Sequence, residues 1–143
     1  MRGSTRNPAR LAAIEAAGAE AVLGDPDVMA TLAGAFEHVS VAAVLLGSAV
    51  GTPARLAALH GTRLDMLLTR LLDTTVRGVV YEAAGSVDPA LLASGAALVR
   101  ERCEDSHIPC VLLRGDPADA RAWMLTALAA VERALDGEQV GPR

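Results

Sequence analysis

The segment VSVAAVLLGSAVG, residues 39–51, decides the fold class of this chain. It contains an unbroken apolar run, Val41–Leu46, which ends at the small residues Gly47, Ser48 and Ala49. An apolar run of this length, bounded by turn-forming residues, indicates a β-strand that is buried on both faces, as in a parallel sheet. Ligands of such sheets bind just beyond the carboxyl ends of the strands. We therefore expect the turn at 47–49 to lie at a binding edge.

Strand and helix signals alternate along the chain. Further strand candidates lie at 19–23, 76–83 and 108–113, and helix candidates at 9–17, 26–37, 52–74 (with a break near Gly61), 88–104 and 116–135. A polar residue followed by proline, which favours a capped helix start, marks Asn7-Pro8, Asp25-Pro26, Thr52-Pro53, Asp88-Pro89 and Asp116-Pro117. This alternation predicts an α/β fold with a parallel sheet and right-handed crossovers. A (β/α)8 barrel needs about 250 residues, so we predict an open, doubly wound sheet of about five strands.

Length and composition limit the class of protein. The chain has 143 residues, enough for one domain, which we place at 1–137 with a disordered tail at 138–143. It is 52% hydrophobic but only 2% aromatic, so the core must consist of Ala, Leu and Val. The net charge of −4 and the lack of a basic run argue against a nucleic-acid partner. No apolar run approaches the ~20 residues of a membrane span, and the start has no secretory h-region. We expect a cytoplasmic protein, and the Ala, Arg, Leu and Gly bias suggests a bacterial one.

The sequence offers no recognisable metal site. His38, His60 and His107 lie in separate segments, without the spacing of metal-binding histidine pairs. Cys103 and Cys110 flank His107 in a C-x3-H-x2-C pattern, which lacks a fourth ligand. In a chain without an export signal, two cysteines are expected to be reduced thiols. Neither a G-x-S-x-G elbow nor a P-loop is present.

Three stretches together resemble one known family. They are RGSTRNPARL at 2–11, GAEAVLGD at 18–25 and LLGSA at 45–49. They resemble the NAD(P)-binding Rossmann domain of atypical short-chain dehydrogenases/reductases, close to NAD-dependent epimerases and NmrA-like proteins, over about residues 2–115. The resemblance implies a Rossmann-like sheet that binds NADP, or NAD, together with a small-molecule ligand.

The resemblance also assigns candidate cofactor-binding residues. Thr5 and Arg6 match the position after the family's second strand, where an arginine contacts the 2′-phosphate of NADP; a solvated arginine is the alternative. Asp25 matches an acidic residue near the adenine, and it also suits a helix N-cap. Gly47, Ser48 and Ala49 match the loop beside the nicotinamide ribose, where small residues allow close approach of a ligand. A tight strand-to-helix turn explains the same three residues equally well.

The chain departs from the family at its start. In the family, a first strand and a Gly-rich turn precede the segment that resembles Thr5–Pro8, and no G-x-G-x-x-G or G-x-x-G-x-x-G occurs here. By analogy with one βα unit, the resemblance leads us to expect that about 25–30 residues are missing. That strand is central in the order 3-2-1-4-5-6. Direct re-pairing of its neighbours, pairing supplied by a partner chain, and reorganisation of the N-terminal region are the possible outcomes. We expect an altered sheet with the 41–46 strand at or near an edge, and a homodimer formed through exposed apolar surface.

Catalytic residues remain unassigned. The family uses a Tyr-x-x-x-Lys pair, but Tyr81 is the only tyrosine, Gly85 stands four residues later, and the chain contains no lysine. Tyr81 ends the 76–83 strand, where the resemblance implies substrate contacts; a core tyrosine is the alternative. Three functional interpretations follow. They are a truncated or degenerate NAD(P)-dependent oxidoreductase or epimerase-like protein, a dinucleotide-sensing NmrA-like module without turnover, and a structural fragment that binds no cofactor.

Overall fold

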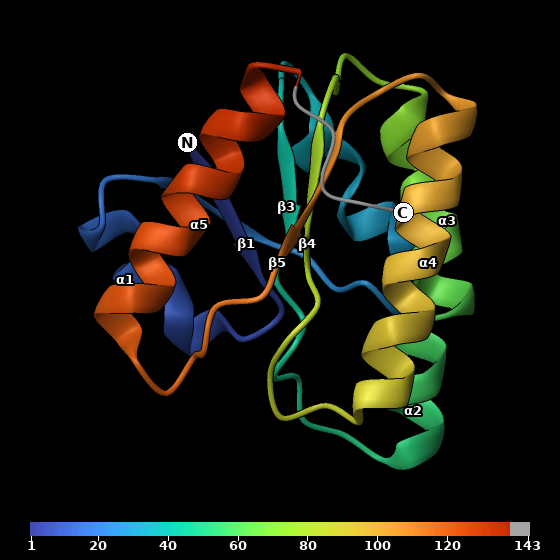
Figure 1. The fold of residues 1–143 in the computed structure, drawn as a ribbon. Coiled ribbons are helices and arrows are strands. Elements are labelled where there is room, and N and C mark those ends of the chain that lie inside the picture. Colours follow the sequence, from blue (N-terminus) through green and yellow to red (C-terminus); the bar gives the residue numbers. More distant parts are fainter. Residues whose placement is uncertain (138–143) are drawn as a thin grey trace.

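The computed structural model describes residues 1–137 as an α/β fold (Figure 1). Its strands are β1 (Arg2–Thr5), β2 (Glu20–Leu23), β3 (Ala42–Val44), β4 (Val79–Glu82) and β5 (Cys110–Leu113). Its α-helices are α1 (Leu11–Ala16), α2 (Pro53–Leu59), α3 (Thr62–Leu72), α4 (Pro89–Asp105) and α5 (Ala120–Leu135). Short 3-10 helices are η1 (Pro8–Arg10), η2 (Met29–Thr31) and η3 (Ala33–Phe36). Helices α1 and α5 cover one face of the strands, and α2, α3 and α4 cover the other. The predicted fold class is confirmed, while the predicted tail at 138–143 lies outside the described residues.

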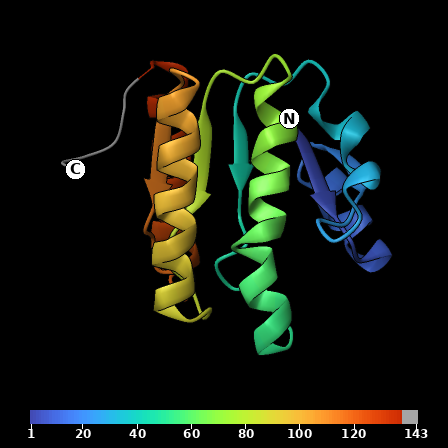
Figure 2. The ribbon, with the colours of Figure 1, turned by 90° about the vertical axis from the view of Figure 1, so that its right-hand side faces the viewer.

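The strands form two parallel sheets instead of one. β1 pairs with β2, with Thr5 opposite Leu23, and β4 pairs with both β3 and β5 in the order β3-β4-β5. β3 is therefore an edge strand, as the family resemblance led us to expect. Figure 2 shows β1 and β3, which belong to different sheets, running in the same direction.

Most helix boundaries follow the predicted caps. The Asn7, Thr52 and Asp88 side chains each accept a hydrogen bond from the first turn that follows them. The break near Gly61 is also present, because α2 ends at Leu59 and α3 begins at Thr62.

Two predicted helix starts are wrong. Asp25 caps a turn through the N–H of Asp27, and the segment predicted as a helix at 26–37 forms only η2 and η3. Asp116 likewise caps a turn through the N–H of Ala118. α5 begins only at Ala120, with Asp119 as its N-cap. In both places Gly-Asp-Pro favours an Asx turn, which competes locally with the helix.

Each face of the three-stranded sheet has its own core. On the α3 and α4 face, buried leucines of α3 pack with residues of α4, β3 and β4; the central ones are Leu64, Leu68, Leu71, Val79 and Val99. On the other face, Ala130 and Ala134 of α5 pack on Val80, Val111 and Leu113. The small side chains of α5 allow that helix to lie close to the sheet, as the low aromatic content predicts.

The segment between β2 and β3 connects the two sheets through buried side chains and hydrogen bonds. Met29 and Leu32 are buried in the larger core. Asp27 accepts a hydrogen bond from Arg55 Nε at 2.9 Å, and Arg63 Nε lies 3.9 Å from its other oxygen. Arg2 of β1 donates through Nη1 to the carbonyl oxygens of Ala35 and Glu37, at 2.9 and 3.0 Å. These contacts position β1 and β2 relative to the three-stranded sheet without a shared strand.

Candidate functional site

The sequence-predicted site residues separate into two groups at the carboxyl ends of the strands. Thr5 ends β1, Arg6 follows it, and Asp25 follows β2, so these three residues lie at the end of the two-stranded sheet. The 47–49 turn follows β3, and Tyr81 lies in β4 beside Val44, so these belong to the three-stranded sheet. The structure thus brings each group together at the end of its own sheet.

The 47–49 turn is fixed by hydrogen bonds from its neighbours. The N–H of Gly47 donates to Glu82 Oε1 at 2.7 Å, and the carbonyl of Gly47 accepts from the N–H of Val87 at 3.0 Å. Ser48 Oγ accepts from the N–H of Ser86 at 3.4 Å. A Cβ atom on Gly47 would overlap the carbonyl oxygen of Ala84, so only glycine fits this close approach. The turn is rigid, and both backbone groups of Gly47 are already used within the protein.

Glu82 organises this edge, although it was not among the residues predicted from the sequence. Its side chain is 5% exposed, and its second oxygen, Oε2, accepts from Trp123 Nε1 of α5 at 2.9 Å. One carboxylate therefore connects β4, the turn after β3 and α5. In the sequence, Glu82 directly follows Val79-Val80-Tyr81 at the end of a buried strand. A buried acid needs hydrogen-bond donors, so an acid at such a position indicates a network of contacts.

Tyr81 and His60 form a buried pair beside this carboxylate. The Tyr81 side chain is 0% exposed, and its hydroxyl lies 2.6 Å from His60 Nδ1. His60 Nε2 lies 3.1 Å from the carbonyl oxygen of Leu46. A carbonyl only accepts, so Nε2 carries the imidazole proton and Nδ1 accepts from the Tyr81 hydroxyl. The neutral imidazole therefore links β4 to the end of β3.

The pair is poorly suited to proton transfer at neutral pH. Burial, followed by the nearby charge of Glu82, raises the pKa of Tyr81 to about 12. Burial also lowers the pKa of His60 below its ordinary value of 6.5, although the hydrogen bond to Leu46 and the Glu82 charge act in the opposite direction. A tyrosine that is fully buried, hydrogen-bonded and this weakly acidic is a poor general acid or base.

The group at the end of β1 is more open. Arg6 is exposed, and its side chain makes no ion pair or hydrogen bond within residues 1–137. Thr5 Oγ1 accepts from the N–H of Asn7 at 3.1 Å, and Asp25 Oδ1 accepts from the N–H of Asp27 at 2.9 Å. Arg6 therefore offers a solvated guanidinium to a ligand, while Thr5 and Asp25 also hold local turns.

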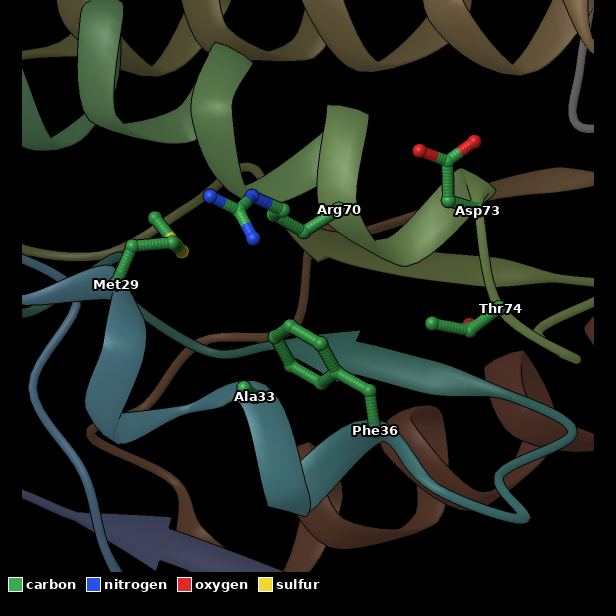
Figure 3. Close-up of a pocket in the computed structure, with 6 residues that line it drawn as sticks. All are labelled: Met29, Ala33, Phe36, Arg70, Asp73 and Thr74. Carbon is green, nitrogen blue, oxygen red and sulfur yellow. The ribbon is translucent and has the colours of Figure 1, made fainter.

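A small cavity lies on a different part of the molecule (Figure 3). It has a volume of about 230 Å³ and is lined by Met29, Ala33, Phe36, Arg70, Asp73 and Thr74. The nearby Thr75 hydroxyl donates to the carbonyl oxygen of Val39, just before β3 begins, so the cavity lies at the amino end of the sheet. The predicted cofactor-binding residues lie at the opposite, carboxyl end.

Residues 1–137 contain no cluster of side chains suited to a metal ion and no helix suited to crossing a bilayer. That part of the chain holds no group of three or more His, Cys, Asp or Glu placed to bind a metal ion. Cys103 and Cys110 are free and buried. No helix there combines the length and apolar character required to cross a bilayer.

The residues of this edge fit a dinucleotide only in part. The free guanidinium of Arg6 suits a phosphate group, and the exposed Ser48 hydroxyl suits a ribose. The pyrophosphate, however, normally rests on N–H groups at the start of a helix. Gly47 N–H is occupied by Glu82, and the start of α2 is capped by Thr52 through the N–H of Arg55. In the described part of the chain, this edge therefore holds an unpaired guanidinium, and the N–H groups of Gly47 and Arg55 already have partners within the protein.

Comparisons with known proteins show a similarity in fold but none in sequence. No protein-family model matches the chain, and no curated protein sequence matches it. Two solved structures of the triphenylmethane reductase of Citrobacter sp. do match in structure, one of them a crystal structure complexed with NADP(H) and the other described for the bioremediation of triphenylmethane dyes. Each has a TM-score of 0.60 and 21% sequence identity, and covers 80% of this chain but 39% of the reductase chain. The chain therefore spans about two-fifths of the reductase, and at this identity the likeness establishes a partial Rossmann-like fold.

Proposed function

We propose that this chain is a dinucleotide-binding protein of the short-chain dehydrogenase/reductase-like Rossmann type, which prefers NADP to NAD. The observation that carries the proposal is the exposed, unpaired Arg6 at the carboxyl end of β1, in a fold that matches an NADP(H)-complexed reductase. Ligands of such folds bind at this edge. The chain spans only part of that reductase, so an oxidoreductase activity for this protein is itself a proposal.

Each end of the dinucleotide has a proposed partner. Arg6 would hold the 2′-phosphate through a charge-assisted hydrogen bond, with Thr5 beside it. Asp25 would contact the adenosine, and the turn Gly47, Ser48 and Ala49 would face the nicotinamide ribose. Tyr81 would act on a substrate only if its hydroxyl were released from His60, because that hydroxyl is buried in the present arrangement.

We expect weak binding by the chain alone. The pyrophosphate carries much of the charge of the ligand and normally rests on backbone N–H groups at the start of a helix. At this edge the N–H groups of Gly47 and Arg55 are already bonded to Glu82 and Thr52. Calorimetry should therefore give a dissociation constant weaker than about 1 μM for NADP, and a weaker one for NAD.

A matched pair of variants tests the assignment. Arg6→Ala should weaken NADP binding about tenfold, through the loss of one charge-assisted contact, and should leave NAD binding unchanged. Arg10→Ala removes another exposed arginine nearby and should change neither. The proposal fails if NADP gives no binding at millimolar concentration, or if the two variants behave alike.

A non-catalytic sensing role is favoured over turnover by one observation. The only tyrosine is buried against His60, and the sequence has no lysine to form the usual catalytic pair. NADPH oxidation with a panel of carbonyl compounds distinguishes the two roles. A protein that binds NADP without oxidising NADPH is a binding module, and steady oxidation with any carbonyl identifies an enzyme.

A homodimer forms part of the proposal. Large apolar side chains are exposed on α5, namely Met124, Leu125 and Leu128. Burying them against a second copy would remove apolar surface from water.

A further inference from the structure

One edge of β3 carries unpaired backbone groups. The N–H of Ala42 donates to Gly78 O at 3.1 Å, and Ser40 O accepts from Arg77 N–H at 2.8 Å, so the even-numbered residues face the β4 side. Because backbone groups alternate along a strand, those of Val41, Ala43 and Leu45 point to the opposite edge. No hydrogen bond joins them to another residue in the part of the chain that the structure describes.

β1 has an equivalent free edge. The carbonyls of Met1 and Thr5 accept from Glu20 and Gly24, at 3.0 and 2.9 Å, so its odd-numbered residues face β2. The backbone groups of Arg2 and Ser4 therefore point away from β2. In Figure 2, β1 lies on the side of β3 that faces away from β4 and β5, and the two strands point in the same direction, with α3 drawn in front of the space between them.

The two edges are held in place by the rest of the fold. The Arg2 guanidinium binds the carbonyls of Ala35 and Glu37, just ahead of β3. Asp27 binds Arg55 and Arg63 from α2 and α3. An incoming strand would therefore meet edges that are already in position, which lowers the entropic cost of binding.

We propose that β1 and β3 together accept one extended segment of a partner protein, which runs parallel to both and joins the two sheets into one. Backbone pairing of this kind is an established mode of peptide recognition at open sheet edges. The proposed site consists of the free backbone edges of residues 2–4 and 41–45. The partner segment must be apolar and must run parallel to both strands.

β4 shows the chemistry that such a segment needs. It is the strand with parallel partners on both sides, and its residues Val79, Val80, Tyr81 and Glu82 are all buried. A segment between β1 and β3 would occupy the same kind of position, so it should be mainly apolar and β-branched. A second copy of this chain is a poorer occupant. If β3 paired with β3 across a two-fold axis, the strands would be antiparallel and β1 would stay unpaired.

Amide hydrogen exchange on the full chain tests the proposal. The probe is the peptide RGVVYEAA, the sequence of residues 77–84, and the control peptide has proline in place of the second valine. The first peptide should slow exchange at Ser4, Val41, Ala43 and Leu45 together by about tenfold or more. The proline peptide lacks one N–H and should give little protection.

Variants of the chain locate the site. Ala43→Pro removes the N–H that faces the open edge but leaves the pairing of Ala42 and Val44 with β4, so it should abolish protection by the peptide. Ala43→Thr keeps that N–H, so the peptide should still protect this variant. Ser4→Pro tests the β1 edge in the same way, and circular dichroism verifies that each variant is folded. Protection of neither edge at millimolar peptide, or of one edge only, overturns the proposal. Self-association that protects β3 without peptide would identify a second copy as the occupant and also overturn it.

Discussion

Glu82 Oε1 accepts a hydrogen bond from the backbone N–H of Gly47 at 2.7 Å, and this contact fixes the turn after β3 to the neighbouring strand. The other oxygen of the same carboxylate accepts from Trp123 Nε1 at 2.9 Å. The side chain is almost fully buried, so these two donors compensate for the loss of water around its oxygens. The position of the turn, and of any ligand it contacts, therefore depends on one acidic residue.

Replacing this carboxylate should destabilise the protein. In Glu82→Gln one oxygen becomes an NH2 group, so either Gly47 or Trp123 loses its acceptor in a buried site. An unsatisfied buried donor costs about 1–3 kcal/mol, and the free energy of unfolding, measured by circular dichroism in urea, should fall by that amount. Glu101→Gln alters an exposed glutamate and should have little effect. Equal stability of the two variants would contradict the role given to Glu82.

His60 should make stability depend on pH. Burial lowers its folded-state pKa below 6.5, so the unfolded chain takes up a proton at a higher pH than the folded chain does. The stability contributed by neutral His60 is therefore present above the unfolded pKa and is lost as the pH falls through it, toward the folded pKa.

The measurement is the free energy of unfolding at about pH 7.5 and about pH 5.5. In the wild type it should decrease at the lower pH, and His60→Asn should reduce that decrease while also lowering stability at both values. His107→Asn is the control, because His107 is exposed and has a φ of 58°, a conformation that asparagine tolerates. If His60→Asn and His107→Asn show the same pH dependence, the lowered pKa assigned to buried His60 is wrong.

Gly95 of α4 lies against the Tyr81 side chain, on the face of the sheet that α4 covers. A Cβ atom at Gly95 would overlap the Tyr81 hydroxyl and lie 2.9 Å from Tyr81 Cζ. Glycine to alanine inside a helix ordinarily stabilises by about 0.5–1 kcal/mol, but here the overlap should make Gly95→Ala destabilising.

A double-mutant cycle isolates this contact. Tyr81→Phe alone should cost about 1–2 kcal/mol, because His60 Nδ1 loses its donor. The same change in a Gly95→Ala background should cost less, since it also removes the overlapping oxygen. Urea unfolding of the four proteins provides the coupling energy, and strict additivity would show that the hydroxyl does not touch Gly95.

The sequence predicted the elements that depend on local signals and missed those that depend on long-range pairing. β3, β4 and β5 follow from buried apolar runs, and α2, α3 and α4 follow from their caps and from Gly61. The helix predicted after Asp25 failed because the side chain of that residue stabilises a competing turn. The open edge of β3 was expected only through the family resemblance, since periodicity within a strand does not reveal which strands lie beside it.

The candidate site shows the same division. The resemblance placed Thr5, Arg6 and Asp25 at strand ends, and the structure places them there. The Glu82 and His60 contacts could not be predicted, because each joins side chains more than 20 residues apart from separate elements. In the sequence, Glu82 and His60 appear only as polar residues next to apolar ones. Many polar residues that are exposed to solvent have the same kind of neighbours.

The exposed stripe of α5 should mediate the proposed self-association. Leu125 and Leu128 are 63% and 52% exposed, so glutamate at both positions should leave the monomer fold intact. Light scattering after size exclusion should show a dimer for the wild type and a monomer for Leu125→Glu/Leu128→Glu, because pairing would bury four added carboxylates without partners. Ala93→Glu/Ala97→Glu places the same charge on the exposed face of α4 and should remain dimeric. A wild-type monomer at all concentrations would rule out the homodimer, and dissociation of both double variants would show that total charge, not this stripe, controls association.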